Sequence, residues 1–297
     1  MVMVAVAVPT ANATMIIVLI TKDGYWVAAD GLKSHGFGKK LVCKIHETKF
    51  GILAKSGTTQ GITESGIDYS TNKVVEELIE SSATSEDFQA AVKQRYSDDI
   101  MQELVYLIND PRVTSATISR FSMKSNLSPT FAQSFSRTLV LLDTSNQNGQ
   151  MRVLEMLPRS ASISALDGSS GYRYYSDTNM DWDDVRHIYV RPIDSTRTPY
   201  PPSVHMFSIP ISYEKPDAWV QLHPKESLLE MLRKGTKEHS GDVGPPYSIV
   251  HVILENKTGP QNSSKGKATI IWVLRGKCPF WDESVDTENT KRKYRNP

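Results

Sequence analysis

A small-x-small tripeptide, Ala11-Asn12-Ala13, stands directly before Thr14 near the start of the chain. Cleavage after Ala13 would make Thr14 the new amino terminus. A terminal threonine carries a hydroxyl nucleophile and an α-amine base on one residue, which is the minimal arrangement for attack on an amide carbonyl. The junction therefore predicts that residues 1–13 are removed, as a signal peptide or a propeptide, and that Thr14 is the catalytic nucleophile.

Two charged residues follow Thr14 at intervals that suit a β-hairpin. Asp30 follows Thr14 by 16 residues, so a strand, a tight turn and a returning strand would place both at one end of a sheet. Lys44 stands where the next hairpin opens, and its ammonium would disfavour protonation of the Thr14 amine, while Asp30 would hold the ammonium in place. Three other lysines are alternatives for the ammonium role: Lys33, Lys39 and Lys40. Lys44 is preferred because Cys43-Lys44-Ile45 leads directly into the second hairpin.

Hydrophobic periodicity predicts the elements that position these residues. A first hairpin joins 15–20 to 25–29 through Lys22-Asp23-Gly24, and a second joins 41–45 to 49–54 through His46-Glu47-Thr48. Two helices follow, one around 74–79 and one that starts at Ser85 as its N-cap. Further strands are expected at 138–142, 152–157 and 161–166, a helix at 224–237, and strands at 247–254 and 268–274. This order predicts an α+β fold of two stacked antiparallel sheets with helices outside.

The proline-rich stretch 172–219 is predicted to be a long insertion with little regular structure. We expect residues 14–276 to form a single domain that contains this insertion, and residues 277–297 to form a C-terminal tail.

Composition excludes several classes of function. Lys and Arg number 34 and Asp and Glu 33, for a net charge of +1, so no global field attracts nucleic acid or an anionic membrane surface. No stretch approaches the roughly 20 apolar residues that span a bilayer. His46-Glu47 lacks the second histidine of a zinc site, and we assign no metal or other cofactor. The two cysteines, Cys43 and Cys278, could form one disulfide if the protein is exported.

The segments at Thr14–Val18, 22–31, 43–45 and 50–57 together resemble the catalytic core of proteasome β-subunit-like N-terminal-nucleophile (Ntn) hydrolases of the bacterial exported type. The resemblance implies a four-layer αββα sandwich and cleavage of peptide or other amide bonds. It implies an oxyanion hole at a backbone N–H in the turn after the second hairpin, from Ser56 or Gly57. It also implies that Ser169, in the Gly-Ser-rich stretch 168–171, supports the terminal amine, and that Asp242, in 240–244, is a supporting aspartate.

Three features differ from the family pattern. The interval from Asp30 to Lys44 is shorter than in proteasome subunits, and the insertion at 172–219 is foreign to ring-forming subunits, which argues against a closed ring. Ala13 replaces the glycine of self-processing subunits and favours a signal peptidase over autolysis. The apolar opening, Met1 to Val8, also suits a signal peptide.

We therefore expect an exported protein, periplasmic or extracellular, and otherwise a cytoplasmic one. Its expected partner is a peptide or amide substrate, and the oligomeric state stays open, homo-oligomers included. The alternative is a catalytically inactive sandwich that serves as an interaction or assembly module through residues 172–219.

Overall fold

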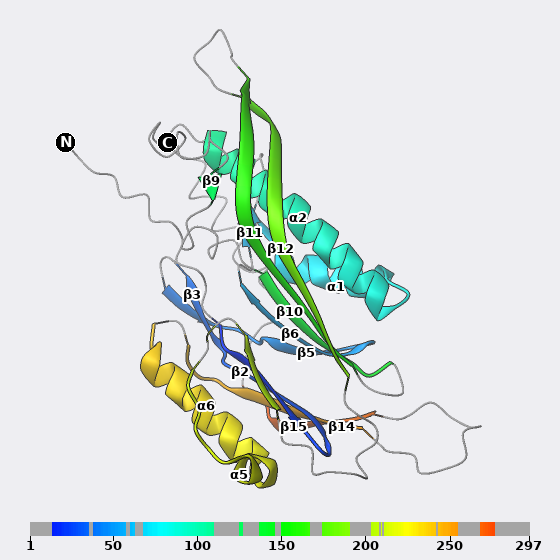
Figure 1. Ribbon diagram of the computed structural model, residues 1–297, viewed down its shortest axis with the longest axis vertical. Coiled ribbons are helices and arrows are strands. Elements are labelled where there is room, and N and C mark those ends of the chain that lie inside the picture. Colours follow the sequence, from blue (N-terminus) through cyan, green and yellow to red (C-terminus); the bar gives the residue numbers. More distant parts are fainter. Residues whose placement is uncertain are drawn as a thin grey trace, which may run out of the picture.

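The computed structural model describes residues 14–35, 38–57, 60–62, 68–109, 125–126, 137–145, 150–166, 174–190, 203–207, 209, 211–241, 243–254 and 268–276. Within them the chain forms two antiparallel sheets stacked face to face, with helices on both outer surfaces (Figure 1). The predicted α+β class and four-layer αββα sandwich are confirmed.

The first sheet has the strand order β13-β1-β2-β14-β15. Its strands are β13 (Ser203–Phe207), β1 (Ile16–Thr21), β2 (Gly24–Ala29), β14 (Ser248–Leu254) and β15 (Ala268–Leu274). The first predicted hairpin is present as β1–β2, in which Thr21 pairs with Gly24 across the Lys22-Asp23 turn. Gly24 has φ +146°, and a Cβ there would lie 2.0 Å from the Val252 carbonyl oxygen, so the position requires glycine.

The second sheet has the order β12-β11-β10-β6-β5. Its strands are β12 (Tyr174–Val190), β11 (Gln150–Leu166), β10 (Arg137–Asp143), β6 (Gly51–Gly57) and β5 (Ile45–Thr48), and a short strand, β9 (Ser125–Asn126), pairs with β11. The strands expected at 152–157 and 161–166 form the single long strand β11. Two small hairpins, β3 (Leu32–His35) with β4 (Gly38–Leu41) and β7 (Gln60–Ile62) with β8 (Asp68–Ser70), complete the described strands.

The second predicted hairpin exists, but its turn was misplaced. The turn lies at Lys49-Phe50, between Thr48 and Gly51, and the residues expected to form it belong to β5. The Thr48 hydroxyl accepts a hydrogen bond from the Phe50 N–H at 3.2 Å and donates one to the Gly51 carbonyl at 2.9 Å. A threonine side chain that bonds to the backbone two and three residues ahead favours a turn at that point, which explains the shift.

The prediction of little regular structure across 172–219 was wrong. This stretch contains β12, which pairs with β11 along its length, and β13, which pairs with β1. Both are edge strands of their sheets, and β11 and β12 extend well beyond their neighbours (Figure 1). An edge strand bonds to one neighbour only, so its sequence can be polar and proline-flanked without losing its place in the sheet.

Helices α1 (Thr71–Ser81) and α2 (Ser85–Asn109) cover the second sheet, and α5 (Asp217–Leu222) and α6 (Pro224–Glu238) cover the first (Figure 1). Thr84, rather than Ser85, caps α2. The Thr84 hydroxyl accepts a hydrogen bond from the Asp87 N–H at 3.1 Å, and Asp87 accepts one in return from the Thr84 N–H at 3.2 Å. This reciprocal pair is a capping box with aspartate in the third position, and it leaves Ser85 free to bond elsewhere.

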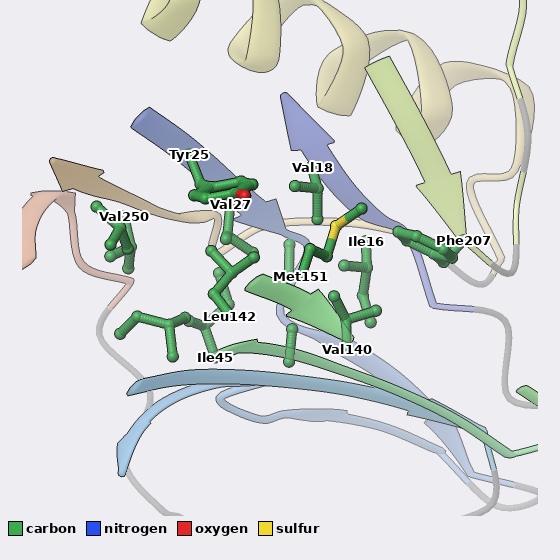
Figure 2. Packing of buried hydrophobic residues seen from close by; sticks show 14 of the residues in the cluster. Ile16, Val18, Tyr25, Val27, Ile45, Val140, Leu142, Met151, Phe207 and Val250 are labelled. Carbon is green, nitrogen blue, oxygen red and sulfur yellow. The ribbon is translucent and has the colours of Figure 1, made fainter. Parts of the chain in front are cut away.

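Among the described residues, three apolar clusters fill the spaces between the four layers. On β1, Ile16 and Val18 point into the space between the sheets, whereas Ile17 points toward α6. Leu142 on β10 belongs to the inter-sheet cluster, and its neighbour Leu141 packs under α1 and α2. Figure 2 shows the inter-sheet cluster. The alternation follows from the two-residue repeat of a strand.

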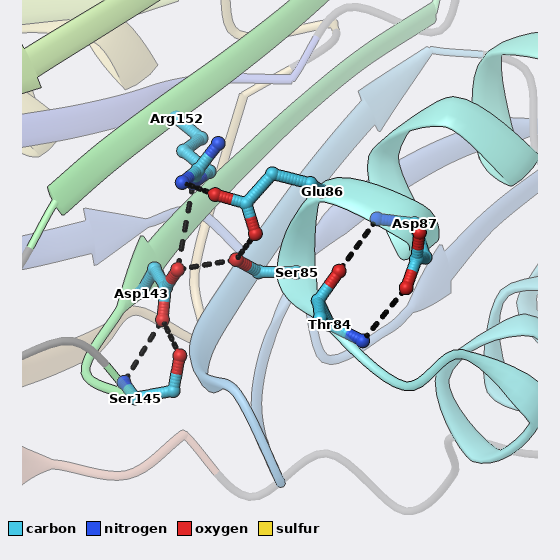
Figure 3. A network of polar contacts seen from close by, with 7 residues as sticks. All are labelled: Thr84, Ser85, Glu86, Asp87, Asp143, Ser145 and Arg152. Carbon is cyan, nitrogen blue, oxygen red and sulfur yellow. Dashed lines mark hydrogen bonds and ion pairs between the residues drawn. The ribbon is translucent and has the colours of Figure 1, made fainter.

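A buried polar network joins the start of α2 to β10 and β11 (Figure 3). Asp143 is fully buried and accepts hydrogen bonds from the hydroxyls of Ser85 and Ser145. Arg152 contacts Asp143, with Nε 3.4 Å from Oδ2, and also pairs with Glu86. Since Asp143 pairs with Gly51, the network lies at the opposite end of β6 from Gly57, and we assign it a structural role.

Candidate active site

The Asp30 carboxylate is the centre of the candidate site. Asp30 comes directly after β2 and is 1% exposed. Its Oδ1 accepts hydrogen bonds from the Met15 N–H and the Lys44 ammonium, both at 2.9 Å. Its Oδ2 accepts bonds from the N–H groups of Leu32, at 3.1 Å, and Gly244, at 3.3 Å. Four hydrogen-bond donors therefore surround one buried carboxylate.

Two hydrogen bonds hold the Lys44 ammonium inside the protein. Lys44 is 6% exposed and donates to Asp30 and to the Leu32 carbonyl, the latter at 2.6 Å. Its own carbonyl accepts the Lys55 N–H at 3.1 Å, which continues the β5–β6 ladder by one residue. Lys44 thus directly precedes β5 of the second sheet and Asp30 directly follows β2 of the first, so the ion pair joins the two sheets at one end of the sandwich.

Thr14 lies next to this pair along the backbone. It is buried, and the following residue, Met15, exchanges bonds with Asp30: the Met15 N–H donates to the carboxylate, and the Asp30 N–H donates to the Met15 carbonyl at 3.3 Å. Because the Lys44 ammonium and the Met15 N–H bind the same oxygen, the ammonium lies within two hydrogen-bond lengths of the first amide after Thr14. The structure therefore brings Asp30 and Lys44 together at the backbone that directly follows Thr14.

The three alternative lysines belong to the β3–β4 hairpin, where Lys33 pairs with Lys40 and Ser34 with Lys39. Among the side chains that the structure describes, Lys44 is the lysine that reaches Asp30.

Ser56 and Gly57 lie inside β6, opposite Thr138 and Arg137 of β10, and not in a turn after the hairpin as expected. The Lys55 N–H faces β5, since it donates to Lys44. Amide directions alternate along an antiparallel strand, so the Ser56 N–H faces β10 and the Gly57 N–H faces the side of β5. Because β5 begins at Ile45, none of the described strands pairs with Gly57 on that side. Gly57 is therefore the better oxyanion-hole candidate of the two.

Ser169 and Asp242 lie outside the described residues. The segment around position 242 nevertheless reaches the site, because Gly244 donates to Asp30 and its carbonyl accepts the Gly31 N–H at 3.0 Å. These backbone contacts of Gly31, Leu32 and Gly244 were not predicted. The glycines and prolines at 241–246 signal an irregular backbone, but nothing local indicates that it meets Asp30.

A pocket of about 660 Å³ is lined by residues of β5, α1, β14 and β15 together with Cys43, and none of the hydrogen-bonded partners of Asp30 described above lines it. Burial and the charge of Lys55 lower the pKa of His46, which lines this pocket, to about 3. The neutral His46 ring donates from Nε2 to the Cys43 carbonyl at 2.9 Å. Cys43 is disulfide-bonded, so it offers no thiolate nucleophile; Cys278 lies outside the described residues.

No group of three His, Cys, Asp or Glu side chains in the described residues is arranged to hold a metal ion. None of the helices in this part of the chain combines the length and the apolar composition needed to cross a bilayer.

No protein-family model matches the sequence, and no curated protein matches it. Among solved structures, the chain is similar to an Anbu (Gly-1) mutant from Hyphomicrobium sp. strain MC1, with a TM-score of 0.36 and 10% sequence identity over 95% of this chain and 92% of that chain. This is a distant similarity of fold, and no conclusion about activity, substrate or assembly follows from it.

Proposed function

We propose that this chain is a threonine-type Ntn hydrolase that cleaves peptide or other amide bonds after residues 1–13 are removed. The observation that carries the proposal is the buried ion pair of Lys44 and Asp30 beside the backbone that follows Thr14. A buried charge pair costs desolvation energy. Here the cation lies close to the first amide after Thr14, near the α-amine that would serve as the general base. The four-layer sandwich is the architecture that the resemblance implies.

In the proposed mechanism, cleavage after Ala13 creates the α-amine of Thr14. Thr14 Oγ1 attacks the amide carbonyl of the substrate and transfers its proton to this amine through a water molecule. The Lys44 ammonium disfavours protonation of the amine by like-charge repulsion, and Asp30 fixes the ammonium. The Gly57 N–H stabilises the oxyanion. The leaving amine departs with a proton, and water then hydrolyses the ester formed on Thr14.

We further propose that the protein is exported and that residues 1–13 are its signal peptide. The disulfide at Cys43 supports this localisation, because disulfides persist in oxidising compartments outside the cytosol. The substrate class is a peptide or another amide.

Two measurements test the function. The intact mass of the protein from its native compartment is expected to show the loss of residues 1–13. A threonine-directed electrophile is then expected to label the wild type and Thr14→Ser at residue 14, while Thr14→Ala is not labelled. Labelling of correctly processed Thr14→Ala at the same rate as wild type would identify another nucleophile and overturn the proposal.

The alternative is an inactive sandwich that acts as an assembly module. Its support is the pair of long strands β11 and β12, which project beyond the other strands of the second sheet (Figure 1). Strand β12 lies within the stretch 172–219. An uncut amino terminus in protein from the native compartment would favour this alternative.

A further inference from the structure

Cys43 directly precedes Lys44 in a segment that belongs to no strand. Residues 42–44 connect β4 to β5. Two backbone bonds hold this connection: the Val42 N–H donates to the Gly31 carbonyl at 2.8 Å, and the Lys44 carbonyl accepts the Lys55 N–H. The first of these bonds reaches the residue after Asp30. The connection that contains Lys44 therefore passes close to Asp30. It also carries a disulfide at Cys43.

The sequence has two cysteines, so an intrachain bond from Cys43 ends at Cys278, two residues beyond Gly276. The Gly276 N–H donates to the Ser248 hydroxyl at 3.3 Å. Ser248 in turn pairs with Ala29, the residue before Asp30. The disulfide thus joins the segment before Lys44 to a segment anchored beside Asp30.

We propose that the Cys43 disulfide positions Lys44 against Asp30, so that reducing the disulfide displaces the ammonium and slows the reaction of Thr14. The part that concerns Thr14 rests on the proposed function. The ion pair joins the ends of two sheets, and the disulfide ties the residue before Lys44 to the chain that continues from Gly276. Without this bond, hydrogen bonds hold the described connection: the two backbone bonds above, the bond from the His46 ring to the Cys43 carbonyl, and those of the Lys44 ammonium itself.

Cys43 is accessible for this chemistry. It is partly exposed and lines the pocket of about 660 Å³ described above, which a small dithiol can enter. The dithiol thiolate attacks one sulfur, the second thiolate resolves the mixed disulfide, and two electrons and two protons pass to the protein. The products are two protein thiols and the oxidised, cyclic dithiol. In an oxidising compartment the bond forms again.

The test compares oxidised wild type, wild type reduced with dithiothreitol, Cys43→Ser and Cys278→Ser. The first readout is independent of catalysis: the ζ-ammonium signal of Lys44 in ¹⁵N-lysine-labelled protein. A buried, hydrogen-bonded ammonium exchanges slowly, so the signal is expected in oxidised wild type and is expected to be lost in the other three samples. Persistence of the signal in folded, reduced wild type would overturn the proposal.

The second readout is the pH dependence of electrophile labelling at Thr14. Moving the ammonium away raises the pKa of the Thr14 amine, so the acid limb of the profile is expected to move to higher pH. At neutral pH labelling is expected to slow roughly tenfold, since one pKa unit corresponds to a factor of ten, and the rates are expected to converge at high pH. An equal slowing at every pH would indicate general loss of structure and contradict the positioning role.

The two cysteine variants separate the bond from the side chain. Both remove the same disulfide, so equal effects are expected, and a change confined to Cys43→Ser would overturn the proposal. If Thr14 fails to react in every sample, the proposed hydrolase function fails, while the ammonium signal still decides whether the disulfide positions Lys44.

Discussion

At the scale of single residues, Lys44 is the cation that pairs with the buried Asp30 carboxylate. Replacing Lys44 with methionine leaves a carboxylate that is 1% exposed without its cation, and we expect the free energy of unfolding to fall by about 3–5 kcal/mol. The double variant Lys44→Met/Asp30→Asn is expected to lose less than the two single variants together, because neither charge is then left unpaired. Urea unfolding of all four proteins measures this coupling, and strictly additive losses would contradict the ion pair.

His46 gives a second prediction, for pH dependence. Burial and Lys55 lower its pKa from the ordinary 6.5 to about 3, so the folded protein keeps the ring neutral while the unfolded chain binds a proton. The His46 contribution to stability is complete above pH 6.5 and is lost as the pH falls toward 3. The slope approaches about 1.4 kcal/mol per pH unit for one proton.

Urea unfolding between pH 7.5 and pH 4 tests this slope. The free energy of unfolding of wild type, relative to that of His46→Gln, is expected to fall as the pH falls. His239→Gln alters an exposed histidine and is expected to run parallel to wild type. If the curve of His46→Gln also runs parallel to wild type, the folded protein binds a proton at His46 as readily as the unfolded chain does, and the prediction is wrong.

At the scale of elements, the loop before β14 packs directly against the end of β2. A Cβ on Gly31 would lie 2.3 Å from the Pro246 carbonyl oxygen, whereas a Cβ on Gly241 would meet nothing within 4 Å. We expect Gly31→Ala to destabilise the fold by at least about 1–3 kcal/mol, because a backbone atom cannot move away as a flexible side chain can. Gly241→Ala is expected to stay within about 0.5 kcal/mol of wild type. Equal unfolding midpoints for the two variants would refute the close approach.

At the scale of the whole molecule, the inter-sheet cluster links the four layers. Leu142 is 1% exposed in this cluster and Leu222 is 73% exposed on α5. Leu142→Ala is expected to cost about 2–5 kcal/mol, and Leu222→Ala no more than about 0.5 kcal/mol. Far-UV circular dichroism and tryptophan fluorescence are both expected to shift to lower urea for Leu142→Ala. A shift in one probe alone would mean that the layers unfold separately.

Local sequence patterns predicted the hairpin β1–β2, helices α1, α2 and α6, and the strands on both sides of them. These features depend on periodicity and turn residues that act over a few positions. The pattern failed at β12 and β13, whose pairing partners β11 and β1 supply the order that their own polar and proline-flanked sequences do not indicate.

The sequence by itself determined that Thr14 lies just before a strand and that Asp30 returns to the same end of the sheet, because one tight turn sets that geometry. The tertiary structure decided that Lys44 reaches Asp30, that Gly244 donates to the same carboxylate, and that Ser56 and Gly57 lie within β6 and not in a turn. These contacts join segments from two sheets and a distant loop. Their formation depends on packing summed over the whole sandwich, which no short stretch of sequence encodes.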